Sequence, residues 1–279
     1  KKNRIREGSK AADVMIYAVA ALFALISLYP LYYVLILSLS SPENAITMQV
    51  YWWPKGLYLD GYKRILTDTK LWIAYRNTIF YAATQMVCML VICSMAAYTL
   101  SSKHLKGRKF LNFYLLVPMY FSGGIIPLFL LMIRLGIYDT PWALILPGMI
   151  SVYNSIICRT AIEAVPDSLT ESAYLDGAND LVICFRIILP LIVPALITSA
   201  IFSFIWRWDD YLSALLYVNR ANMRPVSLAL QLFNDPSSGS DIGSTLAMST
   251  LSIVLLGIST WIRMSLHESP AFLKMKEEG

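Results

Sequence analysis

Charged side chains are scarce in this sequence. Asp, Glu, Lys and Arg make up only 15% of its 279 residues, whereas 57% are hydrophobic and the mean hydropathy is +0.57. A soluble domain carries about 25% charged residues, so this chain has too little charge to cover a water-facing surface. The composition argues against a cytosolic enzyme or a soluble nucleic-acid-binding protein. The net charge of +5 does not change this, because many basic residues flank hydrophobic runs.

Residues that support catalysis or metal binding are also few. The four cysteines and two histidines show neither C-x-x-C nor zinc-ligand spacing, so we expect no disulfide framework and no metal site. The sequence has no G-x-x-x-x-G-K-[ST] phosphate-binding loop, so this chain should not hydrolyse ATP itself. We therefore predict no catalytic residue, no metal and no cofactor bound by this chain.

Long apolar runs are typical of membrane-spanning helices. The first run would be about 39 Å long at 1.5 Å per residue, more than a hydrocarbon core of about 30 Å, so we expect a tilt or a kink at Pro30. The fourth run is short and must extend back through Pro141 or forward into 159–162. Residues 121–124, F-S-G-G, predict a helix break that lines a cavity. The sequence predicts an all-α membrane protein with six transmembrane helices, at 14–39, 72–100, 110–133, 143–158, 185–206 and 242–262.

Basic residues set the expected orientation, because cytoplasmic loops are enriched in Lys and Arg. The most basic short segment, 103–109, follows the second run. Placing it in the cytoplasm puts both termini inside and the loops 40–71 and 207–241 outside. Tyr51, Trp52 and Trp53 in the first loop suit a membrane interface. We predict three regions: 1–71 with the first span and external loop, a membrane core at 72–262, and a cytoplasmic tail at 263–279.

One cytoplasmic segment, 159–186, concentrates acidic residues between two apolar runs. Ser168 and Glu171 have the spacing of a capping box that begins a helix, and Gly177 suits the left-handed residue that ends one. We expect a short helix of about eight residues, and a second helix from Ala178 through the Pro190 region into the membrane. So short a helix needs a docking surface to be stable. A solvated loop with ordinary caps is the alternative.

The sequence 171–178, E-S-A-Y-L-D-G-A, followed by I-x-L-P at 187–190, resembles the EAA loop of ABC-importer permeases. Ser172 stands where the family has Ala. Asp176 and Ala178 extend the match to the D-G-A form of carbohydrate permeases, and the glycine-rich G-x-K-G ending of the family is absent from the tail. Further resemblance lies at 76–78, 96–100, 120–127, 135–148 and 206–212. The resemblance implies a type I (MetI-like) permease core with an EAA coupling loop at 163–190.

This resemblance implies that the short helix docks in a cleft of an ATPase subunit. Glu171 would meet a basic residue there, Gly177 would allow the turn, and Leu169, Ala173 and Leu175 would supply apolar contacts. Ile187, Leu189 and Pro190 would join the helix to the fifth span. The implied ATPase-coupling residues are Ser168, Leu169, Glu171, Ser172, Ala173, Leu175, Asp176, Gly177, Ala178, Ile187, Leu189 and Pro190.

The resemblance also implies the assembly. The partners would be a homologous second permease, an ATPase dimer that carries ATP and Mg, an extracytoplasmic solute-binding protein, a carbohydrate and membrane lipid. No nucleic acid is expected. The location would be the bacterial inner membrane. The subfamily pattern favours an oligosaccharide, by analogy one from an acidic polysaccharide.

Sugar recognition requires aromatic faces and hydrogen-bonding groups around a cavity. Candidate pathway residues, for which helix packing is the alternative role, are Gln85, Tyr120, Tyr153, Asn154 and Trp206. Residues expected at an external partner or gate are Arg207, Trp208, Asp209, Asp210 and Tyr211. A permease for another solute class and an ion-coupled sugar carrier stay open as alternatives. The second fits less well, because no acidic residue lies in mid-span.

Overall fold

The computed structural model describes residues 10–103, 105–233 and 242–267, and their side chains except for 10–13 and 255–267. Most of these residues are helical, and the only strand-like feature among them is an isolated bridge between Ser40 and Leu57. Contacts divide the chain into two units: unit 1, Lys1–Asp68 with Leu232–Ile262, and unit 2, Thr69–Gln231 with Arg263–Gly279. The predicted domain limits, 1–71, 72–262 and 263–279, stay a prediction. Residues 268–279 of the tail and 234–241 of the second external loop lie outside the described residues.

Unit 1 contains the first and last long helices of the chain. Its helices are α1 (Lys10–Ser38), α2 (Pro42–Ile46), α3 (Asp60–Thr67) and α15 (Ile242–His267). Helix α1 is apolar enough to span a membrane, and its 18-residue hydrophobic window buries none of its side chains within the chain. A Cβ at Gly61 would lie only 2.8 Å from the carbonyl carbon of Gly243, so these glycines permit α3 and α15 to approach closely.

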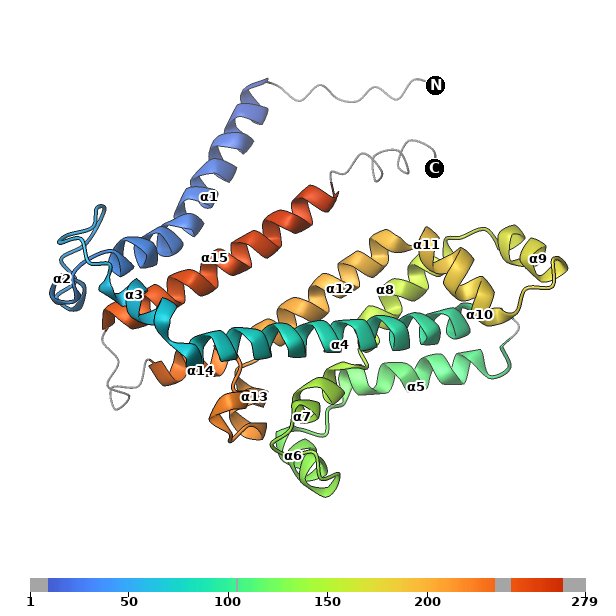
Figure 1. The fold of residues 1–279 in the computed structure, drawn as a ribbon. Helices are drawn as coiled ribbons and strands as arrows, with labels where there is room; N and C mark the ends of the chain where they lie inside the picture. The colour runs from blue at the N-terminus through green and yellow to red at the C-terminus, as the bar shows by residue number, and fades with distance from the viewer. Residues whose placement is uncertain (1–9, 104, 234–241, 268–279) are drawn as a thin grey trace. The chain divides into compact units, whose positions relative to one another are not determined.

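Unit 2 is built around α4 (Thr69–Ser101), which packs along α8 and α12. The buried residues of α4 recur every three or four positions, as on one helical face, from Leu71 through Gln85 to Leu100. Helices α9 and α10 lie at the same end of the unit as the C-terminal end of α4, and α6, α7 and α13 lie toward the opposite end (Figure 1). The other elements are α5 (Arg108–Tyr120), α6 (Ile125–Arg134), α7 (Pro141–Ile145), η1 (Leu146–Gly148), α8 (Val152–Glu163), α9 (Asp167–Leu175), α10 (Asp180–Val182), η2 (Ile183–Ile188), α11 (Leu189–Leu191), α12 (Val193–Trp208), α13 (Leu212–Tyr217), η3 (Ala221–Met223) and α14 (Val226–Phe233), which begins in this unit.

Three of the six predicted spans are bent rather than straight. In the described residues, α1 and α4 are each long and apolar enough to cross a membrane alone, whereas three helix pairs satisfy the same test only together. The bends are 107° between α5 and α6, 43° between Pro141–Gly148 and α8, and 85° between Asp180–Leu191 and α12. The helix predicted from Ala178 through the Pro190 region into the span 185–206 is therefore not continuous, whereas α1, α4 and α15 cover the first, second and sixth predicted segments.

Local backbone chemistry explains these bends. Gly124 has φ +86° and ψ 174°, a conformation essentially restricted to glycine, so the predicted break at 121–124 is confirmed. The fourth span extends in both directions, from Pro141 to Glu163, as its short apolar run requires. Before α12, the helix widens to a π-helix at Ile183–Ile188 and bends at Ile192, between Pro190 and Pro194.

Candidate functional site

Helix α9 begins two residues earlier than the predicted capping box requires. Its N-cap is Pro166, in extended conformation, and the amide of Leu169 donates to the Pro166 carbonyl at 3.2 Å. The expected capping box is wrong, because Ser168 lies inside the first turn, where its carbonyl accepts a bond from the Ser172 hydroxyl at 2.8 Å. The fixed φ of Pro166 starts the helix and places Asp167, not Ser168, as its first residue.

The C-terminal end of α9 agrees with its prediction. Gly177 has φ +80°, its amide donates to the Tyr174 carbonyl at 3.0 Å, and the Ala178 amide donates to the Ala173 carbonyl at 3.0 Å. The next helix begins at Asp180 rather than Ala178, because the side chain of Asn179 accepts from the Val182 amide at 2.9 Å. A sharp turn therefore separates α9 from the segment that leads to α12.

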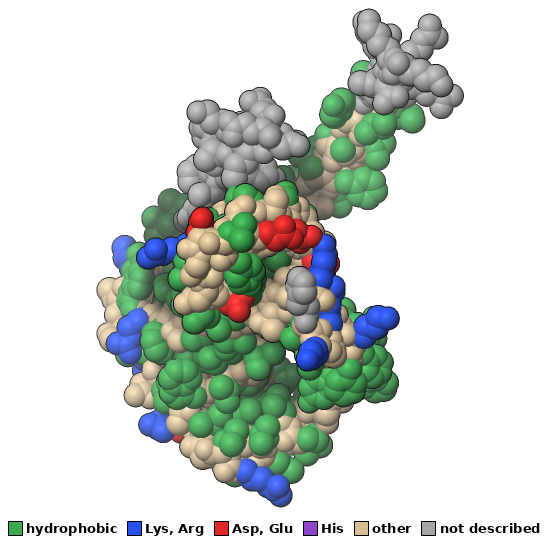
Figure 2. Space-filling view, turned by 90° about the vertical axis from the view of Figure 1, so that its right-hand side faces the viewer, with side chains coloured by type: hydrophobic (Ala, Val, Ile, Leu, Met, Phe, Trp, Pro, Cys, Tyr) green, Lys and Arg blue, Asp and Glu red, His purple; other side chains and the backbone are tan. Residues whose placement is uncertain are grey.

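Helix α9 presents polar and apolar groups outward. Leu175 is 89% exposed, Leu169 is 43% exposed, and the side chains of Asp167, Glu171 and Asp176 are exposed. Figure 2, which views the molecule from this end, shows acidic side chains beside apolar and basic ones. Such a surface suits a partner with a basic group and an apolar cleft. Among the other residues implied for coupling, Ser168, Ser172, Gly177 and Pro190 are exposed, and Ala178, Ile187 and Leu189 are half-buried.

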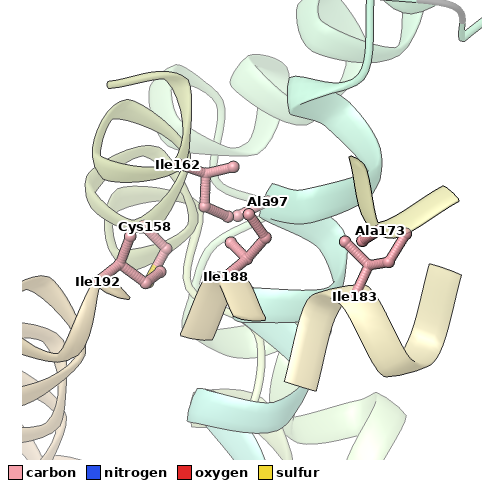
Figure 3. Close-up of a cluster of buried hydrophobic side chains, with 7 residues drawn as sticks. All are labelled: Ala97, Cys158, Ile162, Ala173, Ile183, Ile188 and Ile192. Carbon is pink, nitrogen blue, oxygen red and sulfur yellow. The ribbon is translucent and has the colours of Figure 1, made fainter. Parts of the chain in front are cut away.

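Ala173 is a correction to the expected docking surface. It is only 6% exposed and belongs to a cluster of buried residues from α4, α8, α9 and the segment before α12. Figure 3 shows this inner cluster, whose members are Ala97, Cys158, Ile162, Ala173, Ile183, Ile188 and Ile192. Ala173 faces the chain's own core because it lies on the α9 side opposite the solvent. It packs α9 against the chain's own core.

Ionic contacts fix the helices beside α9. Glu163 pairs with Arg108 at 2.5 Å and with Arg159 at 2.9 Å, and Arg159 also donates to the Asn112 side chain at 2.6 Å. A further pair joins Lys103 to Asp167, both well exposed. The basic segment 103–109 and the acidic segment 159–186 therefore lie at one end of unit 2, as the orientation argument requires.

A cavity of about 740 Å³ gathers most of the predicted pathway residues. Ser151 caps α8 by accepting from the Asn154 amide at 3.2 Å, and this places Tyr153 and Asn154 at the cavity wall. Tyr120 is not in the lining; it ends α5 and is 74% exposed. The lining includes Gln85, Gly148, Tyr153, Asn154, Ser203, Trp206, Arg207, Asp209 and Asp210.

Arg207 connects the predicted substrate-pathway residues to the predicted external partner or gate residues. Its Nε donates to Gln85 Oε1 at 2.6 Å, and its terminal nitrogen pairs with Asp210 at 2.5 Å. Arg207 is only 9% exposed, so direct contact between this side chain and an external partner does not fit the structure. Trp208 is also buried and packs against Tyr75 of α4 and Phe204 of its own helix. A role for Arg207, Asp209, Asp210 and Tyr211 at a gate stays a prediction.

Two buried polar atoms at this cavity have no hydrogen-bond partner in the described structure. They are Asn154 Oδ1, in a residue 2% exposed, and Ser203 Oγ, in a residue 3% exposed. Buried polar groups are normally paired, so two unpaired atoms mark this wall of the cavity as unusual. Ser203 is not among the residues predicted from the sequence. The polar side chains Ser199, Ser203 and Arg207, spaced four residues apart on α12, are the pattern that could have indicated it.

Asp139, in the turn before α7, contacts residues 217–220 at the end of α13. Asp139 has φ +55°, and its carboxylate accepts from the amides of Asn219 at 2.9 Å and Arg220 at 3.1 Å. The guanidinium of Arg220 donates to the same carboxylate at 2.8 Å. The Arg220 hydrogen bond is the largest of the effects that hold the pKa of Asp139 below its ordinary value. This contact ties the turn before α7 to the end of α13.

Unit 2 combines the unbroken apolar helix α4 with three bent helix pairs, and the short exposed helix α9 lies between two of these pairs in the chain. This arrangement is that of a helical membrane permease of the MetI-like fold. The chain belongs to the family described as "Binding-protein-dependent transport system inner membrane component", whose profile matches residues 89–267.

Named relatives are transport permeases. The chain is 36% identical over 227 residues to the polygalacturonan/rhamnogalacturonan transport system permease protein YtcP of Bacillus subtilis, covering 81% of this chain and 79% of the relative. It is 30% identical over 243 residues to the arabinooligosaccharides transport system permease protein AraQ of Halalkalibacterium halodurans, covering 84% and 85%.

A solved structure is also similar. One chain of a bacterial ABC transporter involved in the import of the acidic polysaccharide alginate matches with a TM-score of 0.84 and 30% identity, covering 92% of this chain and 98% of that chain. The predicted membership in the ABC-importer permeases and the predicted fold are confirmed.

Proposed function

We propose that this chain is one of two permease subunits of an ATP-driven oligosaccharide importer in the bacterial inner membrane. The single observation that carries the proposal is α9, a short helix anchored through Ala173 and open to a partner at Leu175 and Glu171. A helix of this length is stable only because it is packed, and its outward side offers the carboxylate and apolar side chains that an ATPase cleft would bind. ATP and Mg would be bound by the ATPase subunits.

The mechanism proposed is alternating access. Closure of the ATPase dimer would move α9, the coupling helix, and the membrane helices would respond by opening outward. The residues on the outward side of α9 (Leu169, Glu171, Leu175 and Asp176) would make the contact, while Gly177 would provide the turn toward α10. Ile187, Leu189 and Pro190 would connect this movement to α12.

The cavity chemistry supports a carbohydrate as the transported substrate. Its volume of about 740 Å³ lies within the usual range for ligand sites, about 300–1,000 Å³. Tyr153 and Trp206 expose aromatic faces, and Gln85, Asn154 and Ser203 add polar side chains to the lining. Relatives named for the transport of polygalacturonan/rhamnogalacturonan and of arabinooligosaccharides, and the structure of an alginate importer, support an oligosaccharide, with uronate-containing sugars included.

The assembly would contain a homologous second permease, two ATPase subunits and an extracytoplasmic solute-binding protein. Both termini would lie in the cytoplasm, because a cytoplasmic basic segment 103–109 after the second of six spans puts both ends of the chain on the same side. The external loop, with Tyr51, Trp52 and Trp53 all more than half exposed, would lie at the outer interface.

The test is co-purification followed by reconstitution. Tagged chain, expressed with candidate ATPase, second permease and binding protein, should recover the ATPase, and proteoliposomes should take up sugar only with ATP. Uptake driven by an ion gradient without an ATPase would instead establish the ion-coupled carrier. A thermal-shift screen of the binding protein against glycans, amino acids and polyamines separates an oligosaccharide importer from a permease for another solute class.

A further inference from the structure

Two routes lead from α9 toward the cavity, and they differ in stiffness. The route through the chain passes the π-helix at Ile183–Ile188 and an 85° bend at Ile192. The second route passes through side-chain contacts of α9 with α4, a single helix of 33 residues with neither glycine nor proline. Kinks occur at prolines and π-helical turns, whereas an uninterrupted helix transmits displacement along its axis. The geometry therefore favours α4 for transmitting movement.

The cytoplasmic end of α4 holds α9 by polar contacts. The Tyr98 hydroxyl on α4 donates to Asp180 Oδ1 at 3.4 Å, and the Tyr174 hydroxyl on α9 donates to the same oxygen. The hydrogen bond to Asp180 is the largest of the effects that raise the pKa of Tyr174, so this phenol stays a donor at neutral pH. Hydrogen bonds to an ionised carboxylate are stronger than neutral ones. One carboxylate thus joins α4, α9 and α10.

The same end of α4 shares a buried apolar cluster with α9. Ala97, next to Tyr98, belongs to the inner cluster with Ala173 of α9, and Ile183 lies beside Ala173 (Figure 3). Ala97 and Ile183 are completely buried. Because close-packed interiors move together rather than compress, a displacement of α9 would reach the end of α4 through this cluster.

The other half of α4 reaches the cavity. Gln85 precedes Tyr98 by about 20 Å along the helix axis, at 1.5 Å per residue. Its amide oxygen accepts the 2.6 Å bond from Arg207, and Arg207 in turn holds Asp210. An axial or tilting movement of α4 therefore changes the position of the Gln85–Arg207 pair in the cavity wall.

We propose that α4 is the arm that carries the movement of α9 to the Gln85–Arg207 pair, with Tyr98 and Tyr174 as positioning residues that share Asp180. This inference rests on the proposed docking of α9 with an ATPase. It assigns to the two hydroxyls a role in transmission and not in binding the ATPase or the sugar.

The first test compares the double variant Tyr98→Phe, Tyr174→Phe with the control Tyr114→Phe, which removes a hydroxyl from an exposed tyrosine of α5. In the reconstituted complex we expect ATPase recovery and ATP hydrolysis to match the wild type, while uptake per ATP hydrolysed falls about tenfold, equivalent to 1.4 kcal/mol. Unchanged uptake per ATP would overturn the inference. So would a loss of ATPase recovery, which would mean that the hydroxyls shape the docking surface.

The second test joins α4 to the α10 segment covalently. Thr99 and Leu181 line one cavity of about 620 Å³ and both are exposed, so a short bis-maleimide can link Thr99→Cys to Leu181→Cys. If α4 and this segment move together, the linked transporter should keep at least half the uptake of the unlinked variant. Abolished uptake would show relative motion and overturn the inference. Failure of the wild type to recover an ATPase would instead refute the proposed function.

Discussion

The carboxamide of Gln85 lies against Gly148, in the space that any side chain at position 148 would fill. A Cβ there would lie 2.3 Å from both Cδ and Oε1 of Gln85. The glycine is therefore required by the close approach of a side chain on α4 to the end of η1. That approach aims the Gln85 oxygen at Arg207.

Replacing Gly148 with alanine should displace Gln85 and break its bond to Arg207. Hydrogen bonds to charged groups contribute about 1.5–3 kcal/mol, so we expect a comparable loss in the free energy of unfolding and reduced sugar uptake. Thermal unfolding in detergent and reconstituted uptake measure the two effects. Gly123→Ala is the control, since a Cβ there meets no atom within 4 Å. Equal behaviour of the two variants would contradict the role of Gly148.

Removing the partner of a buried charge should be costly. Asp210→Asn leaves Arg207, whose side chain is 9% exposed, without its counter-ion, and we expect a loss of about 3 kcal/mol in the free energy of unfolding. The double variant Arg207→Met, Asp210→Asn removes both charges and should recover much of this loss. A double-mutant cycle from denaturation curves checks it. If the single and double variants are equally unstable, the pair is not what stabilises this site.

The effect of a substitution at Gly177 should depend only on how readily the new residue adopts the left-handed backbone conformation. Its φ is +80° and a Cβ there meets no atom within 4 Å, so the cost of alanine comes from the left-handed conformation, about 1–2 kcal/mol. Asparagine, which adopts this conformation more readily, should retain ATPase binding best, and β-branched valine should lose it most. Recovery of the ATPase in pull-down ranks the variants. Alanine, asparagine and valine behaving alike would show that the turn does not position α9.

Asp139 should make stability depend on acid pH. Its folded pKa is lowered by Arg220, so its contribution is complete above the unfolded-state pKa of about 3.9 and is lost as pH falls through the lower folded value. Between pH 5 and pH 3, the melting temperature of the wild type should therefore fall more steeply than that of Asp139→Asn. Asp60→Asn, which removes an exposed pair with Lys63, is the control. Parallel pH profiles for wild type and Asp139→Asn would contradict the prediction.

The sequence predicts the spans and the short helix well, because each depends on local chemistry. Apolar runs define α1 and α4, the glycine pair 123–124 predicts the break before α6, and Gly177 ends α9. The capping box was wrong for a local reason as well, since Pro166 starts the helix before Ser168 can cap it.

The contacts between residues far apart in the chain could not be predicted from the sequence. Nothing in the spacing of Ala173 tells whether it faces a partner or the chain's own core, because the answer depends on Ala97 and Ile183, far away in the sequence. The Gln85–Arg207 bond likewise joins residues on different helices. The sequence pattern identified both side chains as polar residues near the membrane but assigned them to separate sites.

The break between α5 and α6 affects the stability of this subunit in a bilayer. Around Gly124 the helical hydrogen-bond ladder is interrupted, and the Gly124 amide is held only by the Ser122 hydroxyl at 3.2 Å among the described contacts. Hydrocarbon cannot solvate peptide groups, so acyl chains must be kept away from this edge by protein or by water. An isolated subunit would pay the free-energy cost of these exposed peptide groups until a neighbouring subunit covered them. Assembly of the complex is therefore a condition for the stability of this subunit in the bilayer.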